Sequence, residues 1–172
     1  MVKIEDIIHL SSHRKLLEFA KFILSNSERN KLPDYPSLNL MTIPSLVPHI
    51  FVLDVLNSKD KLQVKYCGTV IDSFYGINMT GKCIYDYYKG EETFDDVENI
   101  FRQCIQAKLP SYTRRGIHLE NERVNKFKIA ETIMFPCSSG DGTVNYTIGF
   151  SDYYQVSDLG EQYITLIKPV TP

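Results

Sequence analysis

The chain has 172 residues, of which 43% are hydrophobic, and its formal net charge is −2. This length suits one compact domain with a modest extension and is enough to bury a substantial core. A near-neutral chain lacks the basic surface that neutralises phosphates, so the composition gives no reason to expect a nucleic-acid partner.

The first residues and the cysteines indicate the compartment. Acidic residues occur early, at Glu5 and Asp6, and no apolar run reaches the length of a signal peptide or a membrane span. The cysteines form no Cys-x-x-Cys pair, which excludes a zinc knuckle and a thioredoxin-like motif. We therefore expect a cytoplasmic protein without a membrane partner, with four free thiols at Cys67, Cys83, Cys104 and Cys137.

Residues 1–30 have a helical pattern whose apolar stripe changes direction at Ser11-Ser12. The first stripe contains Ile4, Ile7 and Ile8, and the second contains Leu16, Phe19, Ala20 and Ile23. The offset predicts a break near the serines. We expect this helical extension to pack on its own domain, although the same stripe is also suited to a dimer interface.

Residues 31–48 contain four prolines, which remove backbone donors and favour an extended chain. We interpret this segment as a connector laid over the surface, with Leu46 and Val47 as anchors. It separates the helical extension from a domain at 49–156, and residues 157–172 are interpreted as a C-terminal tail.

The remaining pattern predicts strands at both ends of a helical middle. Two strands are expected at 49–55 and 62–66, followed by helices at 69–75, 83–88 and 91–108, and by strands at 111–118, 126–135 and 144–154. Strict alternation of strands and helices is absent, so a parallel sheet is excluded. The predicted class is α+β, a five-stranded antiparallel sheet with helices on one face and an N-terminal helical extension.

Three glycine-containing segments follow in order: Val64-Lys65-Tyr66-Cys67-Gly68-Thr69, Phe74-Tyr75-Gly76 and Thr80-Gly81-Lys82. Together with the approach at 43–50 and Phe135-Pro136 before Gly140-Asp141-Gly142, they resemble a PAS domain. More narrowly, they resemble a bacterial PAS-like family of small stand-alone proteins, common in alphaproteobacteria. The resemblance implies a sensory or interaction module with no catalytic residues to carry over. It also implies a homodimer or a signalling partner.

The resemblance also implies that a ligand, if one binds, lies between the sheet and its helices. By strand alternation, together with two helical positions, the candidate cavity residues are Tyr66, Phe74, Ile84, Ile129, Glu131, Ile133, Tyr146, Ile148 and Phe150. The simpler interpretation of the same residues is a core that packs shut.

Glu131 is the exception on this apolar strand face. A buried carboxylate must be paired, so Glu131 either anchors a polar ligand or binds an internal Arg or Lys. The simpler interpretation, which we prefer, is a β-bulge that turns Glu131 outward.

Cofactor motifs are weak. Cys83 invites comparison with the photoreactive cysteine of flavin-binding LOV domains, but the Asn-Cys-Arg core of that motif is missing, and a structural thiol explains it. No histidine lies in the long helix at 91–108, and His9, His13, His49 and His118 form no metal trio. The cofactor is therefore unknown, without support for haem, LOV-type flavin or a metal.

Three functions are compatible with these observations. The leading one is a non-enzymatic sensory or interaction domain that binds a small ligand and signals in trans. The second is a small-ligand enzyme or carrier that uses Glu131 as base or polar anchor. The third is a structural dimerisation module.

Overall fold

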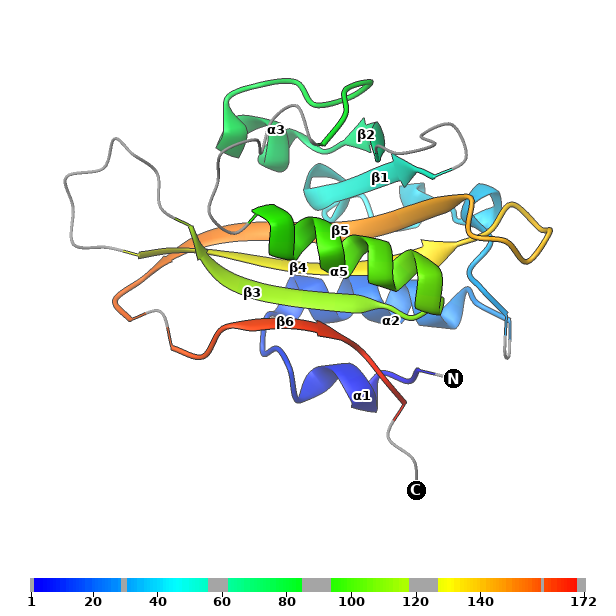
Figure 1. The fold of residues 1–172 in the computed structure, drawn as a ribbon, viewed down its shortest axis with the longest axis horizontal. Helices are drawn as coiled ribbons and strands as arrows, with labels where there is room; N and C mark the ends of the chain where they lie inside the picture. The colour runs from blue at the N-terminus through cyan, green and yellow to red at the C-terminus, as the bar shows by residue number, and fades with distance from the viewer. Residues whose placement is uncertain are drawn as a thin grey trace.

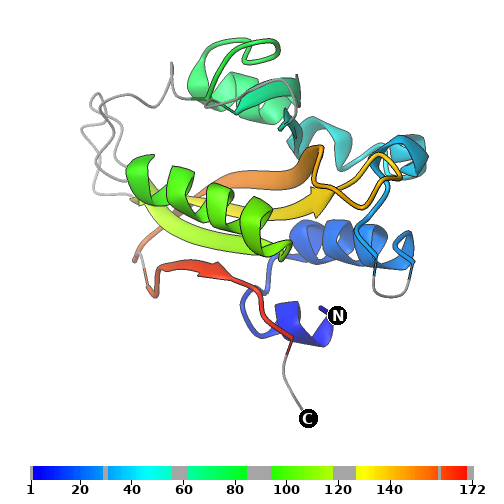
Figure 2. The same ribbon diagram turned by 45° about the vertical axis from the view of Figure 1, so that its right-hand side comes forward.

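The computed structural model describes residues 2–28, 31–55, 62–84, 94–117, 127–158 and 160–169. Within them, six antiparallel strands form one sheet in the order β2-β1-β5-β4-β3-β6. Helix α5 lies on one face of the sheet and α2 on the other (Figures 1 and 2). Each face therefore has its own hydrophobic core.

The first five strands agree with the predicted ones to within a few residues, which confirms the antiparallel α+β class. The strands are β1 Ile50–Asp54, β2 Gln63–Cys67, β3 Ser111–Ile117, β4 Phe127–Cys137, β5 Tyr146–Val156 and β6 Tyr163–Leu166. Strand β6 pairs with β3 at the sheet edge, although the sequence placed these residues in a tail. The segment is only four residues long, too short for its alternation to stand out.

The N-terminal helices confirm the predicted break. Helix α1 spans Glu5–Ile8 and α2 spans Arg14–Ser25. The predicted second stripe of α2 is fully buried, and Phe19 packs against Phe135 and Phe150 of the sheet, with ring centroids 6.1 and 5.8 Å apart. Packing of α2 on its own domain, which we expected, is therefore what the structure shows.

The connector is less extended than predicted. It contains three short 3₁₀ turns, η1 at Tyr35–Ser37, η2 at Leu40–Thr42 and η3 at Val47–His49, because proline also fits the first turn of such helices. Leu46 is buried, as an anchor should be. A bridge between Asp34 and Ser138 ties the connector to the end of β4.

Gly68 shows why the glycine-containing run is needed. A Cβ atom at this position would lie 2.2 Å from the carbonyl oxygen of Pro48, so only glycine permits η3 to pass this closely. The run then enters α3, Thr69–Tyr75, which ends at Gly76 with a left-handed φ of 69°.

The second core lies under α3 and α5, which spans Phe94–Ala107. It contains Phe51 and Leu53 of β1, Ile71 of α3, and Ile100 and Phe101 of α5. Most of the predicted helix at 83–88 lies outside the described residues. This core surrounds a cavity.

Candidate functional site

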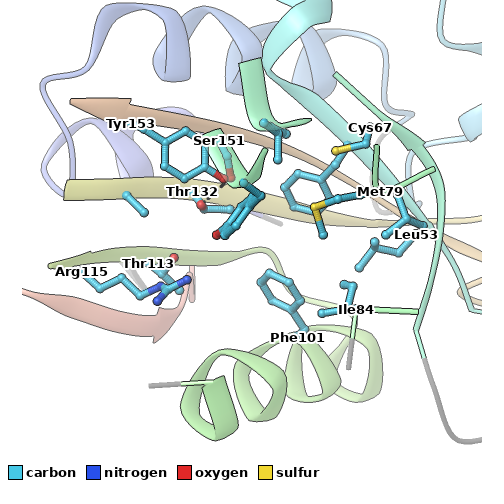
Figure 3. A pocket seen from close by; sticks show the side chains of 15 residues that line it. Leu53, Cys67, Met79, Ile84, Phe101, Thr113, Arg115, Thr132, Ser151 and Tyr153 are labelled. Carbon is cyan, nitrogen blue, oxygen red and sulfur yellow. Dashed lines mark hydrogen bonds between the residues drawn. The ribbon is translucent and has the colours of Figure 1, made fainter. Parts of the chain in front are cut away.

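A cavity of about 50 Å³ lies between the sheet and the helices α3 and α5. This volume accommodates about three to five water molecules, at roughly 10–15 Å³ each. Figure 3 shows that its lining divides into a polar end and an apolar end.

The polar end is built from two rows of residues that cross three strands. In one row, Thr113, Thr132 and Ser151 are register neighbours on β3, β4 and β5, and the Thr132 and Ser151 hydroxyls lie 2.6 Å apart. The second row is Arg115, Ala130 and Tyr153. The sheet therefore presents several hydroxyl groups and one guanidinium group to the same space.

Arg115 is only 7% exposed, which is unusual for a charged side chain. Burial raises the pKa of Tyr153 well above its usual value, with a smaller opposing effect from the charge of Arg115. The Tyr153 ring is held by Phe74, with centroids 3.8 Å apart and an interplanar angle of 10°. The guanidinium of Arg115 lines the cavity beside these hydroxyl groups, and its five N–H donors are suited to binding an anionic group.

The apolar end contains side chains from β1, β2, α5 and the segment after α3: Leu53, Val64, Met79, Ile84 and Phe101 (Figure 3). Phe51 lies above Gly149, where a Cβ atom would come within 2.2 Å of the ring. The missing side chain of Gly149 therefore makes room for Phe51, and Phe51 in turn stacks on Phe101 with centroids 6.1 Å apart.

The predicted cavity residues are divided between the two faces of the sheet. Ile84 lines the cavity, and Phe74 packs on the lining residue Tyr153. The remaining seven belong to the α2 face, by their packing, hydrogen bonds or strand alternation: Tyr66, Ile129, Glu131, Ile133, Tyr146, Ile148 and Phe150. The alternation was right and the assigned face was wrong, because α2 also covers the sheet with an apolar stripe.

Glu131 is not turned outward by a bulge, which corrects the preferred interpretation. The β3–β4 and β4–β5 registers run through it without a shift, and it is 3% exposed. Its carboxylate accepts hydrogen bonds from the hydroxyls of Ser11, Tyr112 at 2.8 Å and Tyr154 at 2.6 Å. Hydroxyl groups, rather than an internal Arg or Lys, provide these hydrogen bonds to the buried charge.

These hydrogen bonds also help to raise the pKa values of the two tyrosines. Burial, followed by the hydrogen bond to Glu131, raises the pKa of Tyr154 to about 12. Burial and the Glu131 charge raise the pKa of Tyr112 well above its usual value. Both hydroxyls therefore stay protonated at neutral pH and act as donors to Glu131.

A second polar cluster lies beside Glu131 at the start of α2. His13 Nε2 lies 3.0 Å from Asp152 Oδ2, and His49 Nδ1 lies 3.3 Å from Asp152 Oδ1. Lys15 Nζ is 3.1 Å from His49 Nε2. The hydrogen bond to Asp152 raises the pKa of His13, whereas burial lowers the pKa of His49. The cluster joins α2, η3 and β5 on the face opposite the cavity.

The cavity cysteine is Cys67, which the sequence analysis did not identify as a lining residue. Burial raises the pKa of its thiol to about 12, so it is a poor nucleophile at neutral pH. The backbone of Cys83 instead forms an isolated β-bridge with Gln63 of the edge strand β2, and Cys83 does not line the cavity. His118 lies outside the described residues.

No family model and no curated protein matches this sequence. Solved structures do match. One is a light-oxygen-voltage domain from a study of a flavin analogue, with 12% identity and a TM-score of 0.52 over 70% of this chain and 86% of that chain. Another is the dark structure of the blue-light photoreceptor Aureochrome1 LOV, with 13% identity and a TM-score of 0.51 over 74% of this chain and 88% of that chain.

Light-oxygen-voltage domains are PAS-fold domains. The chain has the PAS fold. At this level of identity the similarity concerns the fold alone, and the narrower bacterial PAS-like family stays a prediction.

The flavin named for one of these domains does not fit the cavity formed by the described residues. Pockets for ligands of that size occupy roughly 300–1,000 Å³, against about 50 Å³ here. Within the described ranges, no group of three His, Cys, Asp or Glu side chains is suited to a metal ion. In the same part of the chain, no helix is long and apolar enough to cross a membrane.

Proposed function

We propose that this PAS-fold domain is a cytoplasmic sensory module whose cavity binds a small amphipathic anion, of the short-chain carboxylate class. The observation that carries the proposal is the buried guanidinium of Arg115 at the polar end of a cavity whose other end is apolar. Arginine binds a carboxylate through two parallel hydrogen bonds, which fixes the orientation of the ligand as well as its charge.

The residues around Arg115 support the same ligand class. Thr113, Thr132 and Ser151 supply hydroxyl groups for the carboxylate oxygens, and Leu53 and Met79 supply apolar surface for a short alkyl chain (Figure 3). The volume of about 50 Å³ favours a ligand of only a few heavy atoms. Acetate, propionate and butyrate are of this class.

The sheet connects this cavity to the N-terminal helices. Arg115, Thr132 and Ser151 face the cavity, and their chain neighbours Arg114, Glu131 and Asp152 form a register row on the α2 face. A ligand that binds one arrangement of these strands more tightly than another raises the population of that arrangement, to an extent set by the difference in affinity. Because α2 packs on the same strands, its position changes with them. We propose that α2 and the segment before it pass this change to a partner protein or to a second copy of the chain.

The two alternative functions lose support. An enzyme or carrier with Glu131 as base or anchor requires Glu131 in the cavity, but its carboxylate is on the opposite face and accepts three hydroxyl groups. A dimer formed through the apolar stripe of α2 requires that stripe to be free, but Leu16, Phe19, Ala20 and Ile23 are buried in their own domain. We therefore propose a role without catalysis.

The proposal is tested by thermal unfolding with acetate, propionate, butyrate or inorganic phosphate. At a tenfold excess over Kd, a bound ligand should raise the unfolding midpoint by roughly 3–6 °C. Arg115→Gln should remove this rise, and Arg114→Gln, the matched change on the other face, should keep it. An equal rise in both variants, or no rise in the wild type with any of the four anions, contradicts the proposal.

A further inference from the structure

A separate groove of about 730 Å³ lies on the α2 side of the molecule. Its walls are the residues before and within α1, the last turns of α2, and the segment that leads into β3. In Figure 1 these elements meet at the right-hand end of the sheet, beside the label N. Its floor is apolar and includes Val2, Leu24, Leu109 and Phe135.

The rim of the groove is strongly basic. Four lysines, Lys3, Lys21, Lys31 and Lys108, line it together with a single acidic residue, Glu5. This excess is local, because the whole chain has 19 basic and 21 acidic residues. The groove therefore combines an apolar floor with a positive border, and its charge is opposite in sign to that of the chain.

Two of these lysines are already engaged. Lys31 lies 2.5 Å from Glu28, and the Lys108 ammonium donates to the carbonyl oxygen of Gly142 at 2.9 Å. In the part of the chain that the structure describes, Lys3 and Lys21 form no ion pair. These two exposed ammonium groups are available to an incoming carboxylate.

The groove also opens into a second hollow, and the two together exceed the roughly 300–1,000 Å³ of a small-molecule pocket. A neighbouring hollow of about 470 Å³ shares Lys31 and Lys108 with it and continues over the connector and the β4–β5 turn. A single small amphiphile would occupy only part of this surface, whereas a helical segment can follow it.

We propose that this groove docks an acidic amphipathic helix of a partner protein. Leucine-like side chains at positions i, i+3, i+4 and i+7 would fill the apolar floor, and flanking Glu or Asp side chains would face Lys3 and Lys21. The proposal rests on the groove itself and stands whether or not the cavity binds a carboxylate. It supplies the kind of partner through which this domain would act in trans.

The test uses three fluorescein-labelled 14-residue peptides and the full chain. One peptide has Leu at helical spacing and Glu elsewhere, the second has Lys in place of Glu, and the third has the composition of the first in an order without the stripe. We expect saturable binding of the first peptide alone by fluorescence anisotropy, with a Kd below about 1 mM. Its affinity should fall as NaCl is added.

The combined substitutions Lys3→Glu and Lys21→Glu should weaken this binding by roughly tenfold or more, because two attractive charge contacts become repulsive. Lys65→Glu reverses a single lysine charge on β2, the strand at the opposite edge of the sheet from β6, and should leave binding unchanged. Urea unfolding of each variant checks that the fold is retained.

No binding of the first peptide at 1 mM, equal binding of the unstriped peptide, or equal affinity in the lysine variant would overturn the proposal. Lysine-dependent binding of octanoate without peptide binding would overturn it in favour of a small-amphiphile site.

Discussion

Glu131 and Thr132 are adjacent in β4 and face opposite sides of the sheet. The Glu131 carboxylate accepts the hydroxyl of Ser11, in the segment that precedes α2, whereas the Thr132 hydroxyl meets that of Ser151 beside the cavity. One peptide unit thus connects the ordering of the N-terminal segment to the lining of the cavity. Any displacement of this part of β4 moves both groups together.

Substitution of these two neighbours should separate their roles. Glu131→Gln removes the charge that three hydroxyl donors share, and should lower the free energy of unfolding by about 1–3 kcal/mol. It should also speed hydrogen exchange in α2. Glu161→Gln is the matched control, because exposed Glu161 also accepts a tyrosine hydroxyl, that of Tyr163. Urea unfolding and exchange mass spectrometry measure both effects, and similar losses in the two variants would contradict the assignment.

Thr132→Val should act on the other face. Valine keeps the shape of threonine but removes the hydroxyl that meets Ser151. We expect little change in the exchange of α2 amides and a weaker response of the unfolding temperature to butyrate. Faster exchange in α2 without any change in the butyrate response would show that the faces are assigned incorrectly.

The attachment of α2 should depend on pH through His13. Its pKa is raised by Asp152, so its contribution is complete below the unfolded-state pKa of 6.5 and is lost as pH rises through the folded-state value. In its neutral form His13 also caps α2, because its Nδ1 accepts the Leu16 N–H at 3.3 Å, and protonation of the ring removes this acceptor. Protonation also converts the hydrogen bond from Nε2 to Asp152 into an ion pair, and the raised pKa means that this gain outweighs the loss of the cap, worth about 1 kcal/mol.

His13→Gln should therefore destabilise the protein more at pH 5.5 than at pH 8.5. His49, whose pKa is lowered by burial, acts in the opposite direction and is present in both proteins. His9→Gln, at the exposed residue that follows α1, is the control and should show no such difference. A larger loss at pH 8.5 in urea unfolding would contradict the direction of the His13 shift.

Gly68→Ala should be strongly destabilising. The new Cβ would lie 2.2 Å from the Pro48 carbonyl oxygen, a backbone atom that cannot move without displacing η3. We expect a loss of about 1–3 kcal/mol or more in urea unfolding. Gly140→Ala, in a turn where nothing lies within 4 Å, should cost only the strain of its left-handed φ of 95°. Equal losses would mean that the approach of η3 is not what requires glycine at position 68.

The four thiols should differ in reactivity. Cys67, Cys104 and Cys137 are buried and have raised thiol pKa values, whereas Cys83 is half-buried on the β2 edge. Iodoacetamide at pH 7.5 should therefore modify Cys83 first in the native protein. Peptide mass spectrometry identifies the modified residue, and early modification of Cys67 would contradict the burial of its side chain.

Alternation along the strands was sufficient to predict which residues share a face, but not which face they share. Ile148 and Phe150 are on one side of β5, and Ser151 and Tyr153 are on the other, as period two requires. Both α2 and α5 have an apolar stripe, so the apolar face of a strand can pack against either helix. Only the three-dimensional path of the connector decides the matter, and local sequence does not contain it.

The same limit explains why Arg115 was missed. Considered alone, Arg114-Arg115 resembles an exposed charged pair, and its burial depends on pairing with β4 and on the cover provided by the helices. A signal was nevertheless present. Thr113, Thr132 and Ser151 place hydroxyl groups at matching positions of three predicted strands, which is unusual for a face that only packs.

Hydrogen exchange of the wild type and Arg115→Gln, with and without saturating butyrate, measures whether carboxylate binding in the cavity reaches α2. We expect slower exchange of β3, β4 and β5 amides beside the cavity and altered exchange of α2 amides in the wild type. Arg115→Gln should show neither change. Unchanged exchange in the wild type, or the same changes in both proteins, would contradict a carboxylate-binding cavity that communicates with α2.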